Sequence, residues 1–167
     1  QVMGSASRPL VDITVGSEET EPGDGWDYAA TLTSLTANPA MTPAQLATQI
    51  VNDYISSYSP TLGITQSAVR LSLIDELATA IDSFAQAMTS ATGDWTAIGT
   101  ARSQAQEYYY DYYIDLYHFA QLVNQDASIS QAVRDAASSV MTAVSNAVIA
   151  EGHTASVANS HGLSIYY

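Results

Sequence analysis

The stretch VGSEETEPGDGWDY, residues 15–28, gathers five acidic side chains around a Pro-Gly turn and a tryptophan. Carboxylates at this density suit a solvated surface turn, a Ca²⁺ site, or a pocket that receives a positively charged group. The oxygen ligands suit Ca²⁺, but their spacing is not that of an EF-hand. In a pocket, the carboxylates would neutralise a guanidinium, best through a bidentate contact, and Trp26 would supply an apolar or cation–π wall.

A second stretch, EYYYDYYIDLY at 107–117, holds six tyrosines in eleven residues. Such amphipathic rings are typical of subunit contacts, of half-buried packing, and of platforms on which a sugar or a base stacks. The negative charge of the chain argues against a nucleic-acid base. Packing, a subunit interface and a ligand platform all remain open, and the interface candidates are Tyr108, Tyr109, Tyr110, Tyr112 and Tyr113.

The other residues that could do chemistry give weaker signals. The chain has no cysteine, which excludes disulfides, thiolate metal sites and a thiol nucleophile on the chain as given. No pair of histidines has metal-ligand spacing, so we predict no metal site and no cofactor, with Ca²⁺ in the acidic stretch as the alternative. We expect Asp111 and Asp115 to lie on a solvated face. We expect packing from His118, a structural hydrogen bond from His161, and no catalytic role for these two or for His153.

The composition is that of a globular, acidic protein. Its 167 residues are about the size of one compact domain, and 47% of them are apolar, too many for a disordered acidic tail. Four arginines and no lysine oppose 17 acids, which gives a formal net charge of −13. Such a surface repels phosphate backbones and anionic lipids, so we expect neither nucleic acid nor a membrane as a partner. The low lysine content, with many Ala, Ser, Thr and Tyr residues, favours an extracellular or cell-surface protein.

Periodicity and capping signals predict the elements that would position these residues. Strands are predicted at 9–16 and 62–72, with a β-prone tail at 161–167. Helices are predicted at 26–36, 42–58, from Ser72 to 91, and at 95–105, 115–124 and 130–150. The predicted helix caps are Thr42, Ser72 and Asp94, and the predicted left-handed terminator of the last helix is Gly152.

Two or three strands and five or six helices define an α/β chain that is a single domain over 1–167 or part of one. Three scattered strands do not close a sheet. We therefore expect another segment or chain to complete the sheet. The chain opens in QVMGSASRPL without an initiator Met, so we also expect Gln1 to be a cut end.

The order of these motifs resembles the clostripain family of cysteine peptidases, relatives of the caspases. The acidic loop and the final strand are specific to that family, whereas the helices between them are generic. The resemblance implies the C-terminal portion of a caspase-like α/β sandwich, helix-rich with two or three strands. It is carried by VMGS at 2–5, SEETEPGDGWDY at 17–28, TPAQLATQIVNDYISSY at 42–58, DLYHFAQLV at 115–123 and HGLSIYY at 161–167.

The resemblance also implies site residues. In the family, the acidic loop lines the pocket for the substrate Arg or Lys that precedes the cut. The implied pocket residues are Ser17, Glu18, Glu19, Glu21, Asp24, Gly25, Trp26 and Asp27. The match of VMG to the family's LMG places the catalytic Cys position on Gln1, whose amide cannot form a thiolate. The family's catalytic His precedes that Cys, so we predict that this chain alone is inactive.

Two functions follow from these observations. The first is the C-terminal chain of a secreted clostripain-like peptidase, with an N-terminal chain of the same precursor as partner and a basic peptide as substrate. The alternative is a non-catalytic extracellular assembly subunit, a pseudoenzyme that self-assembles with identical subunits into a filament or surface layer. In that case, open strands at 10–15 and 162–167 would pair with neighbouring copies.

Overall fold

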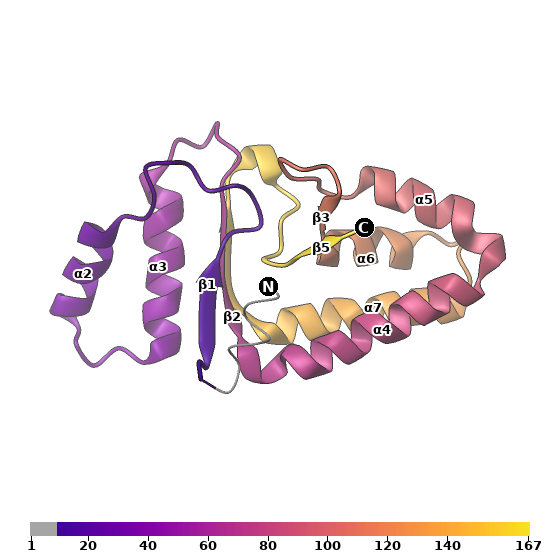
Figure 1. The fold of residues 1–167 in the computed structure, drawn as a ribbon, viewed down its shortest axis with the longest axis horizontal. Coiled ribbons are helices and arrows are strands. Elements are labelled where there is room, and N and C mark those ends of the chain that lie inside the picture. Colours follow the sequence, from indigo (N-terminus) through magenta and orange to yellow (C-terminus); the bar gives the residue numbers. More distant parts are fainter. Residues whose placement is uncertain (1–9) are drawn as a thin grey trace.

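The structure is a computed structural model in which residues 10–167 are described, and this range forms five strands and six α-helices (Figure 1). The strands are β1 (Ile13–Gly16), β2 (Thr65–Arg70), β3 (Tyr113–Asp115), β4 (Val148–His153) and β5 (Ser164–Tyr166). The helices are α2 (Tyr28–Ala37), α3 (Pro43–Ser57), α4 (Ile74–Ser90), α5 (Trp95–Gln104), α6 (Leu116–Gln125) and α7 (Gln131–Ala147). Within the described residues, every helix is too short or too polar to cross a membrane.

The first sheet contains β1, β2 and β4, all antiparallel, with β2 in the centre. Its register pairs Ile13 with Arg70 across β1 and β2. Strand β2 is buried over all but its last residue. The reason is that α3 packs against all three strands, while the Ser67 hydroxyl contacts the carbonyl of Gly162 on the other side.

Helix α3 begins where the sequence predicts it. Thr42 caps the helix, its hydroxyl accepts from the N–H of Gln45, and Pro43 occupies the first turn, which completes the predicted capping box. Ala47 and Val51 pack against Ala68 of β2 in a small core. Helix α2 lies outside α3 and has no buried residue, so it adds a layer rather than a core (Figure 1).

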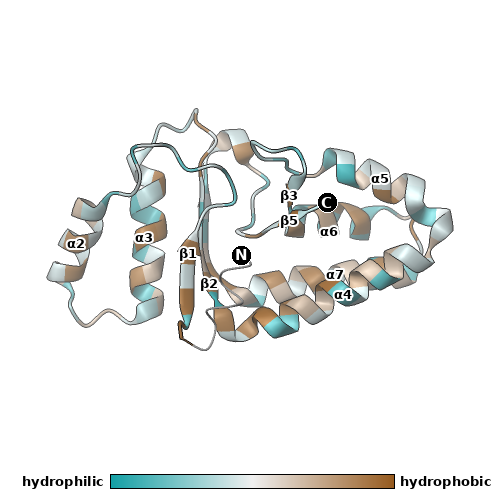
Figure 2. Ribbon diagram, viewed as in Figure 1, coloured by the Kyte–Doolittle hydropathy of each residue, from teal (hydrophilic) through white to brown (hydrophobic). Residues whose placement is uncertain are grey.

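A larger core lies on the other side of the first sheet, among α4, α5, α6 and α7. Phe84 of α4 and Phe119 of α6 meet there with ring centroids 5.7 Å apart. Val133 and Val140 of α7 are at most 1% exposed. Figure 2 shows hydrophobic and hydrophilic residues mixed along α4, as expected of an amphipathic helix with one buried stripe.

Strands β3 and β5 form a second, short antiparallel sheet that ties the end of the chain to the start of α6. Ile114 pairs with Ile165, and the backbone N–H of Leu116 donates to the carbonyl of Leu163 at 2.9 Å. Figure 1 shows this sheet between the first sheet and helices α5 and α6. The last residues of the chain therefore lie in the middle of the molecule.

The predicted α/β class, rich in helix, is confirmed, although five strands are present rather than two or three. Residues 148–150, predicted as the end of the last helix, form the start of β4 instead. Gly152 does not terminate a helix. It lies in β4, where an added Cβ would come within 2.7 Å of Ile55 Cγ1. Glycine therefore allows α3 to pack closely on the sheet.

One of the predicted helix caps is wrong, and another occupies its position without the capping hydrogen bond. A 3₁₀ turn at Leu71–Leu73 precedes α4, so Ser72 does not cap that helix. Asp94 is the N-cap residue of α5, as predicted, but its side chain makes no capping hydrogen bond to that helix. Its carboxylate instead accepts from the backbone N–H of Ser130 at 2.9 Å, which connects the start of α5 to the start of α7 and lowers the pKa of Asp94.

Candidate functional site

Three segments that are far apart in the sequence meet at one end of the first sheet. They are the acidic loop (residues 17–27), the tyrosine segment (residues 107–115) and the closing segment (residues 159–163). Strand β1 leads into the acidic loop, β3 ends the tyrosine segment, and the closing segment precedes β5 (Figure 1). The two sheets thus bring these segments together.

The first half of the acidic loop is fixed by one hydroxyl of β2. Thr65 Oγ1 accepts from the backbone N–H of Glu18 at 2.9 Å and of Glu19 at 3.0 Å, and it lies 2.8 Å from Ser17 Oγ. Thr65 is only 1% exposed. A hydroxyl has one donor and two acceptor positions, so this contact uses its full capacity.

The side chain of Glu18 points into the protein. Its Oε2 accepts from the backbone N–H of Gly162 at 2.9 Å. Its Oε1 is fully enclosed and has no hydrogen-bond partner within the described residues. Burial raises the pKa of Glu18 well above its ordinary value, and the charge of Asp115 raises it further.

Asp115 lies at the centre of the three segments and is 0% exposed. Its Oδ1 accepts from the backbone N–H of His118 at 2.6 Å, which caps α6. Its Oδ2 accepts from the backbone N–H of His161 at 2.6 Å and from the Tyr108 hydroxyl at 3.4 Å. The prediction that Asp115 lies on a solvated face is therefore wrong, because this carboxylate connects β3, α6 and the closing segment.

The two histidines beside Asp115 have pKa values that are shifted in opposite directions. Burial alone would lower the pKa of His161, but the hydrogen bond at 3.1 Å from its Nδ1 to Asp115, together with the charge of Asp115, raises it. Burial lowers the pKa of His118, whose Nδ1 accepts from the backbone N–H of Gln106 at 2.9 Å. The structural hydrogen bond expected of His161 and the packing role expected of His118 are both confirmed. His153 lies apart from this group, 3.0 Å from Glu151.

The second half of the acidic loop faces outwards around a tight turn. Gly25 has a φ of 70° and donates from its N–H to the carbonyl of Pro22 at 3.1 Å. Its own carbonyl accepts from the Tyr58 hydroxyl at 2.6 Å. Glu21 accepts from the indole N–H of Trp26 at 2.9 Å. These contacts hold the turn at the end of α3.

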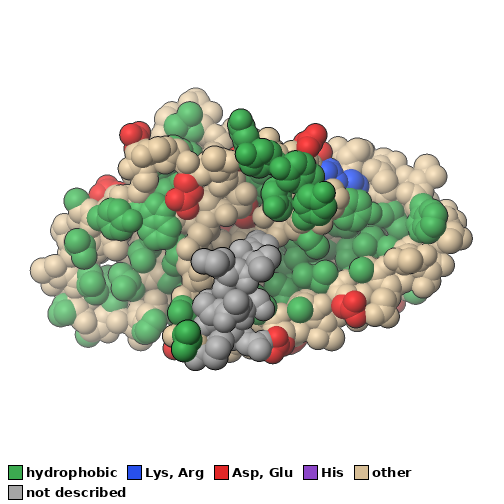
Figure 3. Space-filling view, viewed as in Figure 1, with side chains coloured by type: hydrophobic (Ala, Val, Ile, Leu, Met, Phe, Trp, Pro, Cys, Tyr) green, Lys and Arg blue, Asp and Glu red, His purple; other side chains and the backbone are tan. Residues whose placement is uncertain are grey.

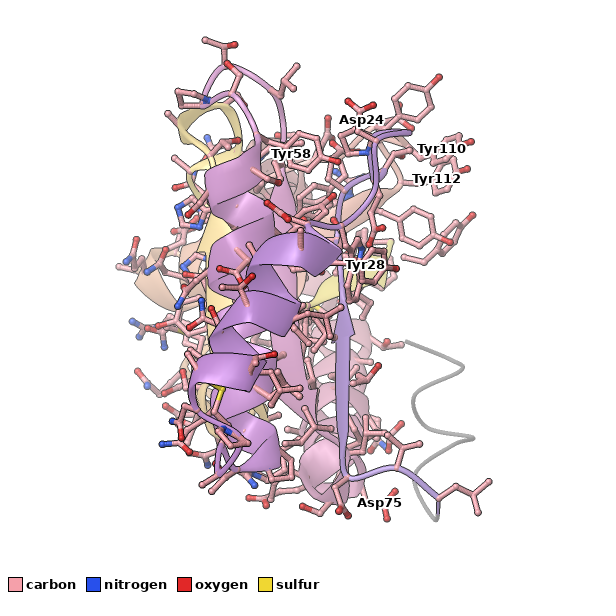
Figure 4. All side chains as sticks on the ribbon, turned by 90° about the vertical axis from the view of Figure 1, so that its left-hand side faces the viewer. Asp24, Tyr28, Tyr58, Asp75, Tyr110 and Tyr112 are labelled. Carbon is pink, nitrogen blue, oxygen red and sulfur yellow. The ribbon has the colours of Figure 1, made fainter. Side chains whose placement is uncertain are left out.

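The carboxylates of this second half differ in the hydrogen bonds that they accept. Asp27 is the N-cap of α2, where it accepts from the backbone N–H of Ala30 at 2.9 Å. Asp24 is exposed, and among residues 10–167 no hydrogen-bond donor reaches its carboxylate. Figure 4 shows Asp24 at the same end of the molecule as Tyr58, Tyr110 and Tyr112. Asp24 therefore keeps its full capacity to accept from an incoming cation.

The tyrosine segment forms an exposed row of rings next to the acidic loop. Tyr110 and Tyr112 stack with centroids 5.4 Å apart, and Tyr166 of β5 lies 5.3 Å from Tyr112. The backbone N–H of Tyr109 donates to Glu19 Oε1 at 3.0 Å, which joins the row to the loop. Figure 3 shows hydrophobic side chains gathered over β3 and β5.

Tyr108 differs from the other interface candidates. It is 7% exposed, and its hydroxyl lies 3.0 Å from Ser160 Oγ inside the closing segment. Tyr109, Tyr110, Tyr112 and Tyr113 are between 39% and 72% exposed. Tyr108 therefore packs within the chain, and only the other four present their rings to solvent.

A hollow of about 690 Å³ opens beside the site. It is bounded by β1, β2, α4 and β5, and mainly apolar side chains line it, among them Val69, Leu77, Ile81 and Leu163. Figure 3 shows hydrophobic side chains in this region between β5 and α4. Glu18 also lines the hollow, at its polar end.

The described residues contain no group of three or more His, Asp or Glu side chains arranged to hold a metal ion. Gln1, the position matched to the catalytic Cys, lies outside the described residues. The sequence analysis missed the contacts of Thr65, Asp115 and Gly162. Gly162 carried a usable signal, since glycine adopts a positive φ more readily than other residues, and its φ is 96°.

The architecture is a portion of a caspase-like peptidase fold. An inactive zymogen C11 protease from Parabacteroides distasonis superposes with a TM-score of 0.68 at 18% identity. A secreted C11 cysteine protease from Bacteroides thetaiotaomicron, in complex with an irreversible peptide inhibitor, has a TM-score of 0.66 at 18% identity. A clostripain from the same organism, in complex with a peptide inhibitor, has a TM-score of 0.62 at 17% identity.

The match covers 98%, 98% and 90% of this chain but 47%, 49% and 61% of those proteins, respectively. This chain thus spans about half the length of the first two. No curated protein matches the sequence. The sequence model of the clostripain family matches residues 5–166, and the chain belongs to that family.

Proposed function

We propose that this chain is the C-terminal part of a secreted clostripain-like cysteine peptidase that cleaves after Arg or Lys. The observation that carries this proposal is the state of Asp24, an exposed carboxylate on a rigid turn with no donor from residues 10–167. A guanidinium or ammonium group offers the donors that this carboxylate lacks. Membership of the clostripain family supports the same assignment.

The base of such a peptidase would come from outside this chain, and the position of the nucleophile falls on Gln1, whose amide cannot serve as one. A thiolate attacks the carbonyl after the Arg or Lys, and an imidazole protonates the leaving amine. No cysteine is present in the sequence, and the three histidines lie in structural contacts or away from the acidic loop. On this proposal the chain alone does not cut peptides, and its contribution is to bind the basic side chain.

We propose that a further segment of the same precursor, here called the companion segment, packs into the hollow beside the site. Mainly apolar side chains line it, among them Val69, Leu77, Ile81 and Leu163. An apolar surface of this kind is typical of a site that another protein segment covers. The related zymogen is about twice as long as the part that this chain matches. A segment of the same precursor that filled the hollow would extend the antiparallel sheet and exclude water from the site.

The test is co-expression of this chain, with Cys in place of Gln1, and the segment that precedes it in its precursor. Arg-amide and Lys-amide fluorogenic peptides should be cleaved by the assembled protein, and an Asp-amide peptide should not. Asp24→Asn should abolish cleavage after Arg, whereas Asp82→Asn on the exposed side of α4 should leave it unchanged. Absence of turnover by a folded, assembled complex would contradict the proposal.

A second candidate is a non-catalytic assembly subunit, which the exposed tyrosine row favours. Tyr109 and Tyr166 are largely exposed, at 72% and 69%. Aromatic rings in a continuous row are typical of subunit contacts. Sedimentation at increasing protein concentration distinguishes the two functions. An assembly subunit should form large particles as the concentration rises. The double variant Tyr110→Ser, Tyr112→Ser should prevent these particles from forming. A monomer at all concentrations would rule out self-assembly.

A further inference from the structure

The carboxyl group of Glu18 is in an unusual position for an acid of a surface loop. Its Oε1 is fully enclosed without a hydrogen-bond donor from the described residues, and its side chain lies against those of Asp115 and Tyr108. A buried carboxylate oxygen without a donor costs free energy, and a second carboxylate beside it adds repulsion. Both costs vanish if one of the two acids carries a proton.

The hydrogen bonds decide which acid carries the proton. Asp115 accepts from two backbone N–H groups, those of His118 and His161, and from the ring of His161 and the hydroxyl of Tyr108. These donors satisfy an ionised carboxylate. Glu18 accepts one backbone hydrogen bond, from Gly162, through Oε2. Its Oε1 is therefore the atom left to carry a hydrogen.

We propose that Glu18 is a positioning residue, a neutral carboxylic acid that donates its hydrogen to Asp115 and so fastens the acidic loop to the closing segment. It does not contact the cationic side chain of a substrate. Its effect is to hold Ser17, Glu18 and Glu19 rigidly, so that the turn at Asp24 projects from a fixed base. The link to substrate binding rests on the proposed function, whereas the fastening of the loop does not.

The surrounding charges set the direction of the pH dependence. Asp115 faces Glu18 from the start of α6, Tyr108 faces it from the tyrosine segment, and His161 and His118 lie behind Asp115. Glu18 has a folded-state pKa above its unfolded value, so its stabilising effect is complete below the unfolded pKa. That effect is lost as pH rises through the folded-state pKa, because the ionised Glu18 then repels Asp115.

The test compares Glu18→Gln and Glu18→Ala in the full chain, with Trp95→Phe as background so that Trp26 reports on the loop. Glutamine has the shape of a neutral acid and keeps a donor, so Glu18→Gln should keep the Trp26 emission of the folded protein. It should also reduce the fall in Tm with rising pH, because the amide cannot ionise beside Asp115. Glu18→Ala should shift the Trp26 emission at every pH.

Two controls make the test specific to this proton. Glu21→Gln, in the exposed half of the same loop, should keep the pH profile of the parent chain. Infrared difference spectra at neutral pH should show a protonated carboxyl band in the parent chain that is absent from Glu18→Gln. Absence of that band in the parent, or failure of Glu18→Gln to fold, would overturn the proposal, because a neutral isostere must fit a site built for a neutral acid.

These measurements are separable from the proposed peptidase activity. In the assembled peptidase, Glu18→Ala should raise KM for an Arg-amide peptide, and Glu18→Gln should restore the parental KM. If the infrared and fluorescence results hold but the assembled protein cleaves no peptide, the proposed function fails and the positioning role stands. If cleavage occurs and Glu18→Gln behaves like Glu18→Ala, the positioning role fails alone.

Discussion

The two halves of the acidic loop contain similar residues but have opposite environments. In the first half, Thr65 fixes the backbone and Glu18 points inward to Gly162. In the second half, Glu21 accepts from the indole N–H of Trp26, and Asp24 is exposed at the turn. The first half anchors the loop, and the second half presents carboxylates to solvent.

This difference shows that a run of acids need not act as one site. The distinction comes from partners contributed by β2, the tyrosine segment and the closing segment, none of which is near the loop in sequence. A carboxyl group placed beside Asp115 serves packing and orientation, whereas one on the glycine turn is available to a ligand. The following changes test that division, beginning with the largest expected effect.

Asp115→Ala should have the largest effect because it strips the acceptor from four donors at the junction of the three segments. We expect the free energy of unfolding to fall by about 3–5 kcal/mol, the usual loss when a buried hydrogen-bonded charge is removed. Urea unfolding followed by circular dichroism measures this. Asp111→Ala, on the exposed part of the tyrosine segment, is the matched control, and an equal loss there would remove the distinction between inner and outer acids.

Gly162→Ala should rank second. The φ of 96° is unfavourable for alanine, and an added Cβ would lie 2.9 Å from the Cβ of Ser67 and 3.1 Å from Val148 Cγ1. Strain and overpacking together should cost about 2–4 kcal/mol. Gly23→Ala, where an added Cβ meets nothing within 4 Å, should be nearly neutral. Thermal unfolding of the two variants provides the comparison, and a tolerated Gly162→Ala would show that the closing segment can shift.

Thr65→Val tests the anchor of the first half. The change keeps the shape of the side chain but leaves the N–H groups of Glu18 and Glu19 without their acceptor, so we expect a loss of about 1–3 kcal/mol. The Trp26 emission should also move towards that of a solvated indole. Thr20→Val, on the exposed part of the loop, should change neither quantity. If Thr65→Val keeps the stability and the Trp26 emission of the parent protein, then water accepts the hydrogen bonds of Glu18 and Glu19 in place of the hydroxyl.

His161→Gln should have a smaller effect that depends on pH. The pKa of His161 is raised in the folded state, so its contribution is fully present below its unfolded pKa and is lost as pH rises through the folded-state pKa. Glutamine should therefore lower the Tm at acidic pH and leave it nearly unchanged at alkaline pH. Melting curves across this range measure it, and a constant offset at all pH values would show a packing role only.

Asp24→Asn should have the smallest effect on stability. No donor from residues 10–167 contacts this carboxylate, so its neutralisation removes no contact within the described chain. We expect the same Tm and the same Trp26 emission as in the parent protein. A marked loss of stability would mean that the second half of the loop also anchors the fold, and the comparison between the halves would then fail.

The sequence predicted local structure well where local signals suffice. The capping box at Thr42 and the amphipathic spacing of α4 gave the correct helices, because both signals depend on neighbouring residues. The same reasoning wrongly predicted residues 148–150 as helical, because apolar residues after α7 continue the apolar pattern of that helix. Only pairing with β2 makes this stretch a strand, and that pairing joins residues about eighty positions apart.

The site was predictable only in part for the same reason. The density of acids drew attention to the loop, but nothing near Glu18 in sequence shows that it faces inward. Asp115 and Tyr108 looked like members of an exposed acidic and aromatic stretch. Their burial follows from the arrival of the closing segment, which no periodicity within residues 107–117 encodes.

The contact between Glu18 and Gly162 spans 144 positions, almost the whole chain. During synthesis, residues 159–163 are made long after residues 17–19, so the acidic loop stays without this hydrogen bond until the closing segment has emerged and packed against it. A chain that stops before residue 159 would lack the backbone N–H of Gly162 that Glu18 contacts. The fold thus completes its acidic loop only after the closing segment has been synthesised.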